Sequence, residues 1–203
     1  MKNFMKILFK VIATAVLLLI LTALLLFGYF NLSGPEPRED VDLGMTFSSR
    51  YAEALGLNQR EVYLALLDDI GVKKMRLPVY WDLVEQERGV YDFSEVDWQL
   101  DEAAKRGVEV ILTVGIKVPR WPECHIPQWV GDDALSRREG ILPFVETTVM
   151  RYREHPALAK WQVENEPFLR FGICPPLDVT LLEDEIALVK RLDASRPVLL
   201  PDS

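Results

Sequence analysis

Short apolar runs alternate with longer helical patterns along residues 42–203, and this alternation limits the possible folds more than any other feature of the sequence. The predicted strands are 41–47, 72–78, 108–114, 158–164 and 197–201. Helical spacing of apolar residues predicts helices at 58–70, 94–106, 136–154 and 179–194, and Asn58 and Ser94 are the predicted N-caps of the first two. Such alternation is typical of βαβ units, in which helices cover a parallel sheet. Right-handed crossovers leave two main candidates, an open doubly wound sheet and a (β/α)8 barrel.

The loops favour the barrel. The Gly-rich phosphate loop of a dinucleotide-binding sheet does not follow the first predicted strand. Instead, Trp, His, Asn, Arg and Glu follow the strands, and barrels place their chemistry at the C-terminal ends of strands. Such a barrel takes about 250 residues, whereas this sequence reaches Ser203 directly after a fifth predicted strand. We therefore expect a TIM barrel of which about the first five strands are present. The alternative, an unusual half-barrel, would leave a sheet edge exposed.

An uncharged apolar run of 20 residues precedes this pattern. A helix of about 20 such residues spans the hydrocarbon core of a bilayer. Three lysines lie before the run, so the positive-inside rule puts the N-terminus in the cytoplasm and the rest of the chain outside. A cleaved signal peptide is the alternative, with an apolar core of about 7–15 residues and a small-residue cleavage site. The predicted segments are a cytoplasmic tail at 1–10, an uncleaved anchor at 11–30, a stiff linker at 31–40 and the barrel at 41–203.

Charge and composition narrow the class of partner. Removing the three N-terminal lysines from the 23 basic residues leaves 20, against 31 acidic ones, so the exported part carries about −11. This charge argues against a nucleic-acid partner, which favours a basic face. It suits a domain that acts on a neutral polymer or a small molecule. His125 and His155 lack the spacing of metal ligands, so we expect no metal, and nothing in the sequence indicates an oligomer.

The stretch WQVENEP, residues 161–167, places Glu164 and Glu166 two residues apart at the end of a predicted inner strand. Charged side chains are seldom buried unless they are paired or functional. Glu166 is followed by Pro167, which cannot continue a central ladder. A carboxyl partly desolvated there by Trp161 keeps its proton to higher pH, as a general acid requires. The alternative is a capping or salt-bridged glutamate.

The tripeptide Asn-Glu-Pro at 165–167 resembles the motif that ends the fourth strand of retaining glycoside hydrolases of clan A. This is the (β/α)8 group that includes the cellulase-like family 5. Three other segments fit the resemblance: 43–47 resembles the family's first strand, 75–78 with Trp81 its second, and 87–114 the unit that follows. The resemblance covers most of residues 42–203, and only the first five of eight strands.

The resemblance implies hydrolysis of O-glycosidic bonds in an oligo- or polysaccharide, with retention and without a cofactor. Glu166 would be the acid/base, and Asn165 would bind the sugar hydroxyl beside the reacting carbon. Arg76 would lie near the nucleophile and hold it ionised. That nucleophile is a second glutamate at the end of a seventh strand, which lies outside this sequence, so we expect the 203-residue chain alone to be inactive.

Two alternatives to a glycosidase stay open. A non-catalytic carbohydrate-binding or cell-wall scaffold protein could share the same fold, since fold does not guarantee chemistry. A (β/α)8 hydrolase of esters or amides is a weaker alternative, because it would need a nucleophile or metal ligands that the sequence does not show. A glutamate at the end of the seventh strand would distinguish an enzyme from a binding protein.

Glu164 departs from the family, in which an apolar or small residue often precedes the asparagine. Strand alternation would put Glu164 and Glu166 on the same inner face, unless the chain bends at Asn165. Glu164 could pair with Arg76, bind a sugar or be a buried structural charge. Structural pairing is favoured, because buried carboxylates usually have partners.

Aromatic residues in the loops are candidates for substrate binding. Trp81, Trp121 and Trp129 follow the second and third predicted strands, where an indole could stack on the apolar face of a sugar. The equally weighted alternative is that they cover the rim of the barrel as ordinary core. His125 is a candidate for binding a hydroxyl.

Both cysteines follow predicted strands. Cys124 lies in the loop after the third strand and Cys174 in the loop after the fourth. These loops are neighbours at the same end of a sequentially ordered parallel barrel. We expect a disulfide between them, since such bonds persist in oxidising compartments, although two unpaired thiols are the alternative.

Overall fold

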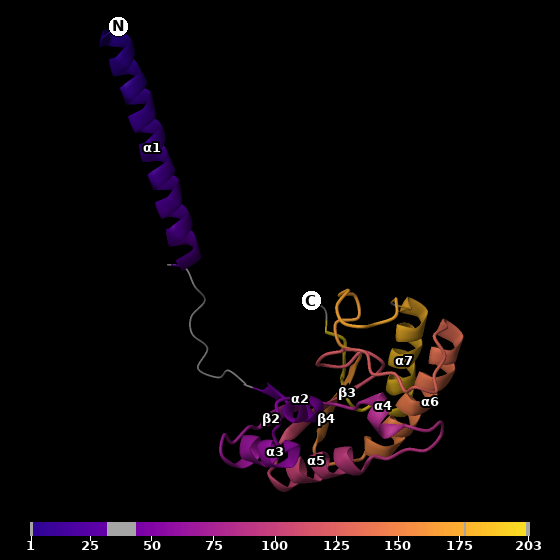
Figure 1. Cartoon of the computed structure of the whole chain (residues 1–203). Helices are drawn as coiled ribbons and strands as arrows, with labels where there is room; N and C mark the ends of the chain where they lie inside the picture. Colours follow the sequence, from indigo (N-terminus) through magenta and orange to yellow (C-terminus); the bar gives the residue numbers. More distant parts are fainter. Residues whose placement is uncertain (1, 32–43, 177, 202–203) are drawn as a thin grey trace. The chain divides into compact units, whose positions relative to one another are not determined.

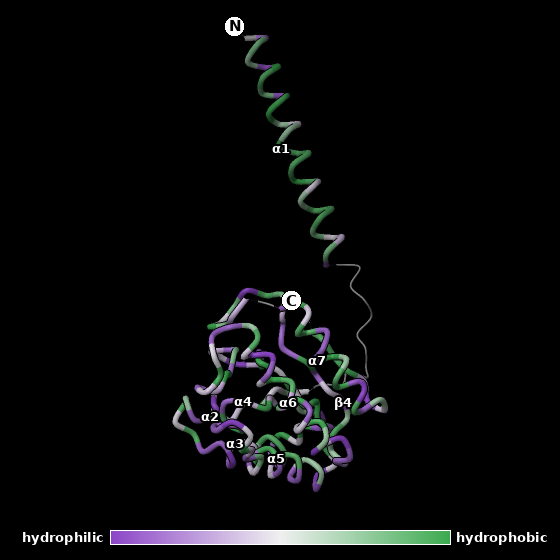
Figure 2. The backbone as a smooth tube through the Cα atoms, turned by 90° about the vertical axis from the view of Figure 1, so that its right-hand side faces the viewer, coloured by the Kyte–Doolittle hydropathy of each residue, from purple (hydrophilic) through white to green (hydrophobic). Residues whose placement is uncertain are grey.

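The computed structural model describes residues 2–31, 44–176 and 178–201, and the chain divides into two units, Met1–Val41 and Asp42–Ser203. The first unit holds one helix, α1 (Lys2–Asn31) (Figure 1), whose residues are mainly hydrophobic (Figure 2). It is long and apolar enough to cross a membrane, a test that a signal sequence at this position also passes. The predicted linker at 31–40 lies, apart from Asn31, outside the described residues.

The second unit contains a parallel five-stranded sheet in the order β1-β2-β3-β4-β5. The strands are β1 (Met45–Thr46), β2 (Lys74–Pro78), β3 (Glu109–Val114), β4 (Leu158–Val163) and β5 (Val198–Leu199). The predicted strands and their parallel, sequential order are confirmed. Strands that neighbour one another in sequence order are typical of a barrel, whereas the strand order of a doubly wound sheet reverses partway across the sheet. The first and last strands are shorter than predicted, and residues 41–43 lie outside the described part.

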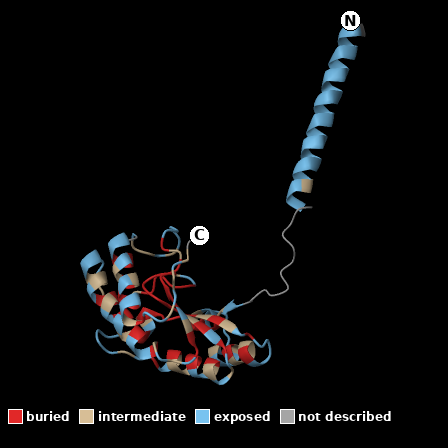
Figure 3. Ribbon diagram, turned by 180° about the vertical axis from the view of Figure 1, so that it is seen from behind, coloured by how far each residue is buried: buried red, intermediate tan, exposed pale blue. Residues whose placement is uncertain are grey.

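The two faces of the sheet differ in chemistry. Alternate strand residues point to opposite faces, and one set is apolar and almost fully buried: Met75, Leu77, Val110, Leu112, Val114, Trp161 and Val163. The helices pack against this set, with α5 on β3 and α7 on β4, and buried residues gather along the strands (Figure 3). The other set is more polar and includes Arg76, Thr113 and Gln162. The polar face therefore corresponds to the barrel interior, which leads up to the site.

The helices of this unit are α2 (Ser49–Ala54), α3 (Gln59–Asp68), α4 (Trp81–Val84), α5 (Ser94–Lys105), α6 (Ala134–Tyr152) and α7 (Val179–Leu192). Short helices α2 and α4 were not predicted. Asn58 caps α3 as predicted, because its side chain accepts hydrogen bonds from the amides of Arg60 and Glu61. The predicted capping role of Ser94 is wrong. Ser94 is the first helical residue of α5, and its amide donates to the side chain of Asp92 at 2.9 Å.

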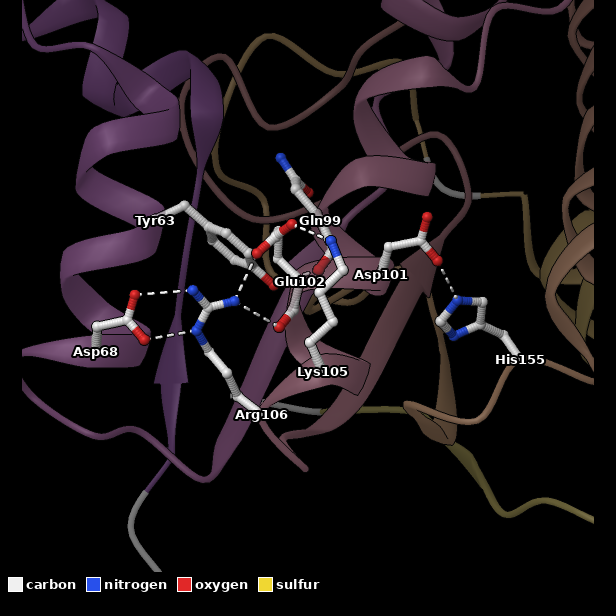
Figure 4. Close-up of polar contacts among 8 residues, drawn as sticks. All are labelled: Tyr63, Asp68, Gln99, Asp101, Glu102, Lys105, Arg106 and His155. Carbon is white, nitrogen blue, oxygen red and sulfur yellow. Dashed lines mark hydrogen bonds and ion pairs between the residues drawn. The ribbon is translucent and has the colours of Figure 1, made fainter.

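Ion pairs join α3 and α5 near the amino ends of the strands. Arg106, which follows α5, binds Asp68 at 2.6 Å and Glu102 at 2.5 Å (Figure 4). Beneath this pair, the hydroxyl of Tyr63 donates to the carbonyl of Gln99 at 2.8 Å. In a barrel, the amino-terminal end serves stability and the carboxyl-terminal end carries the chemistry. The network is therefore structural, and the site is sought at the other end.

Candidate active site

The backbone turns sharply where β4 ends. The strand stops at Val163, one residue earlier than predicted, and Glu164 and Glu166 then adopt φ angles of 57° and 48°. Residues other than glycine rarely enter this left-handed region. Side-chain alternation therefore stops at Val163, and the interpretation that placed both glutamates on one inner face is wrong. The alternative, a bend of the chain at Asn165, is the one found, and the unusual φ angles belong to the residues on both sides of Asn165.

Arg76 of β2 meets the end of β4. Its guanidinium donates to the side-chain oxygens of Gln162 and Asn165, both at 3.3 Å, and to the hydroxyl of Thr46 at 2.9 Å. Burial lowers the pKa of Arg76, and the nearby carboxylate of Glu166 opposes this shift. Arg76, Asn165 and Glu166 therefore lie together at the carboxyl end of the sheet.

Glu166 is half-buried, and its backbone is held from the neighbouring loop. Its carbonyl oxygen accepts hydrogen bonds from the ammonium group of Lys117 at 2.8 Å and from the amide of Leu169 at 3.0 Å. Lys117 also donates to the carbonyl of Leu169 at 2.7 Å. The side chain of Lys117 thus holds the backbone of the segment that carries Glu166. Sequence reasoning missed this role of Lys117.

Glu164 is buried and does not pair with Arg76. Its two carboxylate oxygens accept hydrogen bonds from the amides of Ile116 and Lys117, each at 2.6 Å. Burial raises the pKa of Glu164 to about 7, and these two hydrogen bonds oppose the shift. Of the three roles considered for Glu164, the structure shows the buried structural charge, with backbone amides in place of the expected arginine.

A second buried carboxyl group lies on α7. Glu185 is 1% exposed, and burial and the charge of Glu164 raise its pKa. One of its oxygens, Oε1, has no hydrogen-bond partner among the described residues. Sequence reasoning missed Glu185, although the sequence holds a signal for it. The residue occupies the apolar stripe of α7, between the buried pairs Leu181–Leu182 and Leu188–Val189.

A cavity of about 640 Å³ lies beside these carboxyl groups. Its walls come from the loop after β3, the loop after β4 and helix α7, and include Glu164, Glu185, Phe168 and Phe171. The predicted disulfide is confirmed, since Cys124 and Cys174 are bonded with their Cα atoms 5.2 Å apart. The bond joins the two loops at the carboxyl end of the sheet, next to the segment of Glu166.

Trp81 belongs to the core. It is 0% exposed, its ring lies 5.9 Å from that of Phe144, and its indole nitrogen donates to Glu85 at 2.7 Å. The proposed sugar platform is therefore wrong for Trp81, and the core alternative is correct. Trp129 packs edge-on against Trp81 and donates to the carbonyl of Glu85 at 2.8 Å. Trp129 is partly buried and packs against the core to which Trp81 belongs.

Trp121 and His125 differ in accessibility. Trp121 is 62% exposed, and its ring lies 5.9 Å from the ring of Phe171 in the loop after β4. It stays a candidate for stacking on a sugar. His125 is 1% exposed, lies within 3.2 Å of the carbonyl of Arg120, and has its pKa lowered to about 4 by burial. The prediction that His125 binds a hydroxyl is therefore wrong, because the neutral ring is enclosed.

Metal ligands do not gather at this site. Within the described residues, no group of three or more His, Cys, Asp or Glu side chains could hold a metal ion. The chemistry available to the site is that of carboxyl groups, an amide and a guanidinium.

Three solved structures that resemble the chain are a mannosidase, a GH5_18 protein and an endo-glycoceramidase. An exo-β-1,4-mannosidase from Opitutaceae bacterium strain TAV5 superimposes with a TM-score of 0.61 and 16% identity, over 78% of this chain and 31% of that one. A GH5_18 protein from Streptomyces cattleya, in complex with GlcNAc, gives 0.58 and 16%, over 77% and 43%. Endo-glycoceramidase II from a Rhodococcus species gives 0.56 and 17%, over 78% and 49%. The chain therefore has, in part, the TIM-barrel-like fold of these three proteins, and the predicted fold class is confirmed.

The similar curated sequences include β-galactosidases. A β-galactosidase from Halorubrum lacusprofundi is 24% identical over 129 residues, which are 51% of this chain and 17% of the relative. A β-galactosidase from an Arthrobacter species is 28% identical over 123 residues, 51% of this chain and 18% of the relative. No family model matches the chain. The matched parts thus cover less than a fifth of each of these two relatives.

Proposed function

We propose that this chain supplies the acid/base half of a glycoside hydrolase site, with Glu166 protonating the leaving glycosidic oxygen. The observation that supports it most strongly is the meeting of Asn165 and Glu166, at the carboxyl end of β4, with Arg76 of β2. Arg76 donates to the oxygen of Asn165, which leaves the amide NH₂ group as the donor for a sugar hydroxyl. A hydrogen bond to the hydroxyl beside the reacting carbon strengthens as the transition state is reached.

The proposed mechanism retains the configuration of the sugar. Glu166 would first act as a general acid and then, in the second step, as the base that activates water. The nucleophile would be a glutamate on a seventh strand, outside this sequence, about 5–5.5 Å from Glu166. Arg76 would keep that nucleophile ionised. On this proposal the 203-residue chain alone has no hydrolytic activity.

The proposed substrate is an oligo- or polysaccharide. Trp121 offers an exposed indole in the loop that the disulfide joins to the loop after β4. Indole rings stack on the apolar faces of sugars while their N–H group donates. No cofactor is needed for this chemistry, because the carboxyl groups transfer the protons.

We also propose that α1 anchors the protein, with the N-terminus in the cytoplasm and the barrel outside. The apolar helix and the lysines before its apolar part support this orientation. Mass spectrometry of the protein isolated from membranes tests it. An intact N-terminus is expected, and a mature chain that begins after α1 would show a cleaved signal sequence instead.

A non-catalytic carbohydrate-binding protein is the alternative function, and turnover separates the two. The full-length gene product is expected to release sugar from a panel of 4-nitrophenyl glycosides and oligosaccharides, and its Glu166→Ala variant to release far less. Glu109→Gln, at the exposed start of β3 at the opposite end of the sheet, is the matched control and should retain activity. Calorimetric binding of a sugar without turnover by the wild type would support the binding protein. Neither binding nor turnover would contradict both functions.

A further inference from the structure

Two buried carboxyl groups near the segment of Glu166 take no part in the proposed proton transfer. Glu164, from the end of β4, is 7% exposed, and Glu185, from α7, is 1% exposed. The charge of Glu164 acts on Glu185, and Oε1 of Glu185 lacks a hydrogen-bond partner among the described residues. A buried carboxyl group that stays ionised needs a partner. Both groups line the cavity between the two disulfide-linked loops and α7.

The charges around the pair are uneven. Lys117 is the buried cation next to Glu164, and it is 6% exposed. Asp178, at the start of α7, adds a negative charge that acts on Glu185, and Arg170 lines the same cavity. Two ionised glutamates against one buried lysine would leave an excess negative charge out of water. The cluster is balanced when one glutamate keeps a proton. The hydrogen bonds from the amides of Ile116 and Lys117 favour ionised Glu164, so the proton belongs on Glu185.

We propose that Glu164 and Glu185 are positioning residues that hold one proton between them and, through Lys117, fix the segment that carries Glu166. The proposal rests on the proposed function of Glu166. Glu164 binds the amides of Ile116 and Lys117, and the carbonyl of Lys117 accepts from the amide of Asn165 at 2.7 Å. The ammonium group of Lys117 then binds the carbonyls of Glu166 and Leu169.

If Glu185 also lost its proton, the contacts that run from Glu164 through Lys117 to the segment of Glu166 would weaken. Both carboxyl groups have raised pKa values in the folded protein, so the unfolded protein loses these protons at lower pH than the folded one. The contribution of Glu164 to stability is therefore complete below its ordinary pKa of 4.5 and is lost as pH rises to about 7. The contribution of Glu185 is lost in the same way as pH rises through its own raised pKa. Above that range two like charges face each other in a buried site, and the loops that Lys117 joins should loosen.

Backbone NMR of the full chain in detergent micelles tests the proposal without any sugar. The amides of Ile116 and Lys117 are expected to titrate in two steps, the first near neutral pH as Glu164 ionises and the second as Glu185 ionises. The amides of residues 166–169 should move in the same steps. Glu185→Gln should remove the second step, and Glu183→Gln, on the exposed side of α7, should leave both steps in place.

Each other outcome contradicts a defined part of the proposal. A wild-type chain whose Ile116 and Lys117 amides do not titrate would show that the pair does not share a proton, even where Glu185→Gln fails to fold. Titration at Ile116 and Lys117 with residues 166–169 unchanged would show that the pair does not position the segment. Persistence of the second step in Glu185→Gln would assign that step to another group. None of these results depends on whether Glu166 cleaves glycosides.

Discussion

Glu166→Gln in the full-length gene product is expected to lower the hydrolysis of substrates with poor leaving groups by about 10²–10⁴-fold, the usual contribution of general acid catalysis. Glutamine keeps the shape of the side chain but supplies no proton to the departing oxygen. Activated aryl glycosides, whose leaving groups depart without a proton, should lose much less in the first step. Rates for both substrate types, measured side by side, give this ratio.

Azide provides a second readout for the same variant. With the acid/base removed, the small anion can attack the glycosyl-enzyme intermediate without base assistance, so azide should restore part of the turnover. Equal loss on both substrate types without rescue would argue against Glu166 as the acid/base. The exposed Glu109→Gln variant should show neither effect, because Glu109 lies at the opposite end of β3.

Gly115→Ala is expected to destabilise the second unit more than Gly71→Ala, at which an added Cβ meets no neighbouring atom. Gly115 follows β3 with φ of +129°, and a Cβ there would lie 2.4 Å from Oε1 of Glu164. The carboxylate cannot move away without losing its hydrogen bonds to Ile116 and Lys117. Overpacking of this kind costs about 1–3 kcal/mol, in addition to the backbone strain. Chemical denaturation of the variants measures the loss.

Gly71→Ala is the matched control for that substitution. Gly71 also has a positive φ, +71°, but a Cβ there would meet nothing within 4 Å. It should cost only the strain of the left-handed region, about 1–2 kcal/mol. In a Glu164→Ala background the extra cost of Gly115→Ala should shrink, because the clash is gone. Equal costs at the two glycines, or an unchanged cost in that background, would contradict the placement of Glu164.

The sequence predicted the features that depend on periodicity and topology. Apolar runs located the strands, Asn58 located the start of α3, and the sequential order of strands brought the two cysteines together. The same order placed Arg76 beside Asn165, because the carboxyl ends of parallel strands share one edge. These inferences need only the direction of the strands and the end of the sheet at which each loop lies.

The features that it missed depend on three-dimensional packing. Burial of Trp81 and His125 arises from α4 and the loop after β3, whose paths no periodic pattern fixes. The positive φ angles of Glu164 and Glu166 broke the alternation from which their faces were inferred. Glu185 is a charged residue in the apolar stripe of α7, but the sequence does not show that Glu164 lies near it. The two residues are separated in the chain by the loop after β4 and by a turn of α7.

The position of a bound substrate tests the central claim most directly. A crystal structure of the Glu166→Gln variant of the full-length gene product with an uncleaved oligosaccharide would show the reacting bond. The account predicts the side chain at position 166 within about 2.6–3.2 Å of the glycosidic oxygen, the reach of a general acid, and Asn165 bonded to the hydroxyl beside the reacting carbon. A substrate whose glycosidic oxygen lies far from position 166, with another acid in contact with it, would contradict the account.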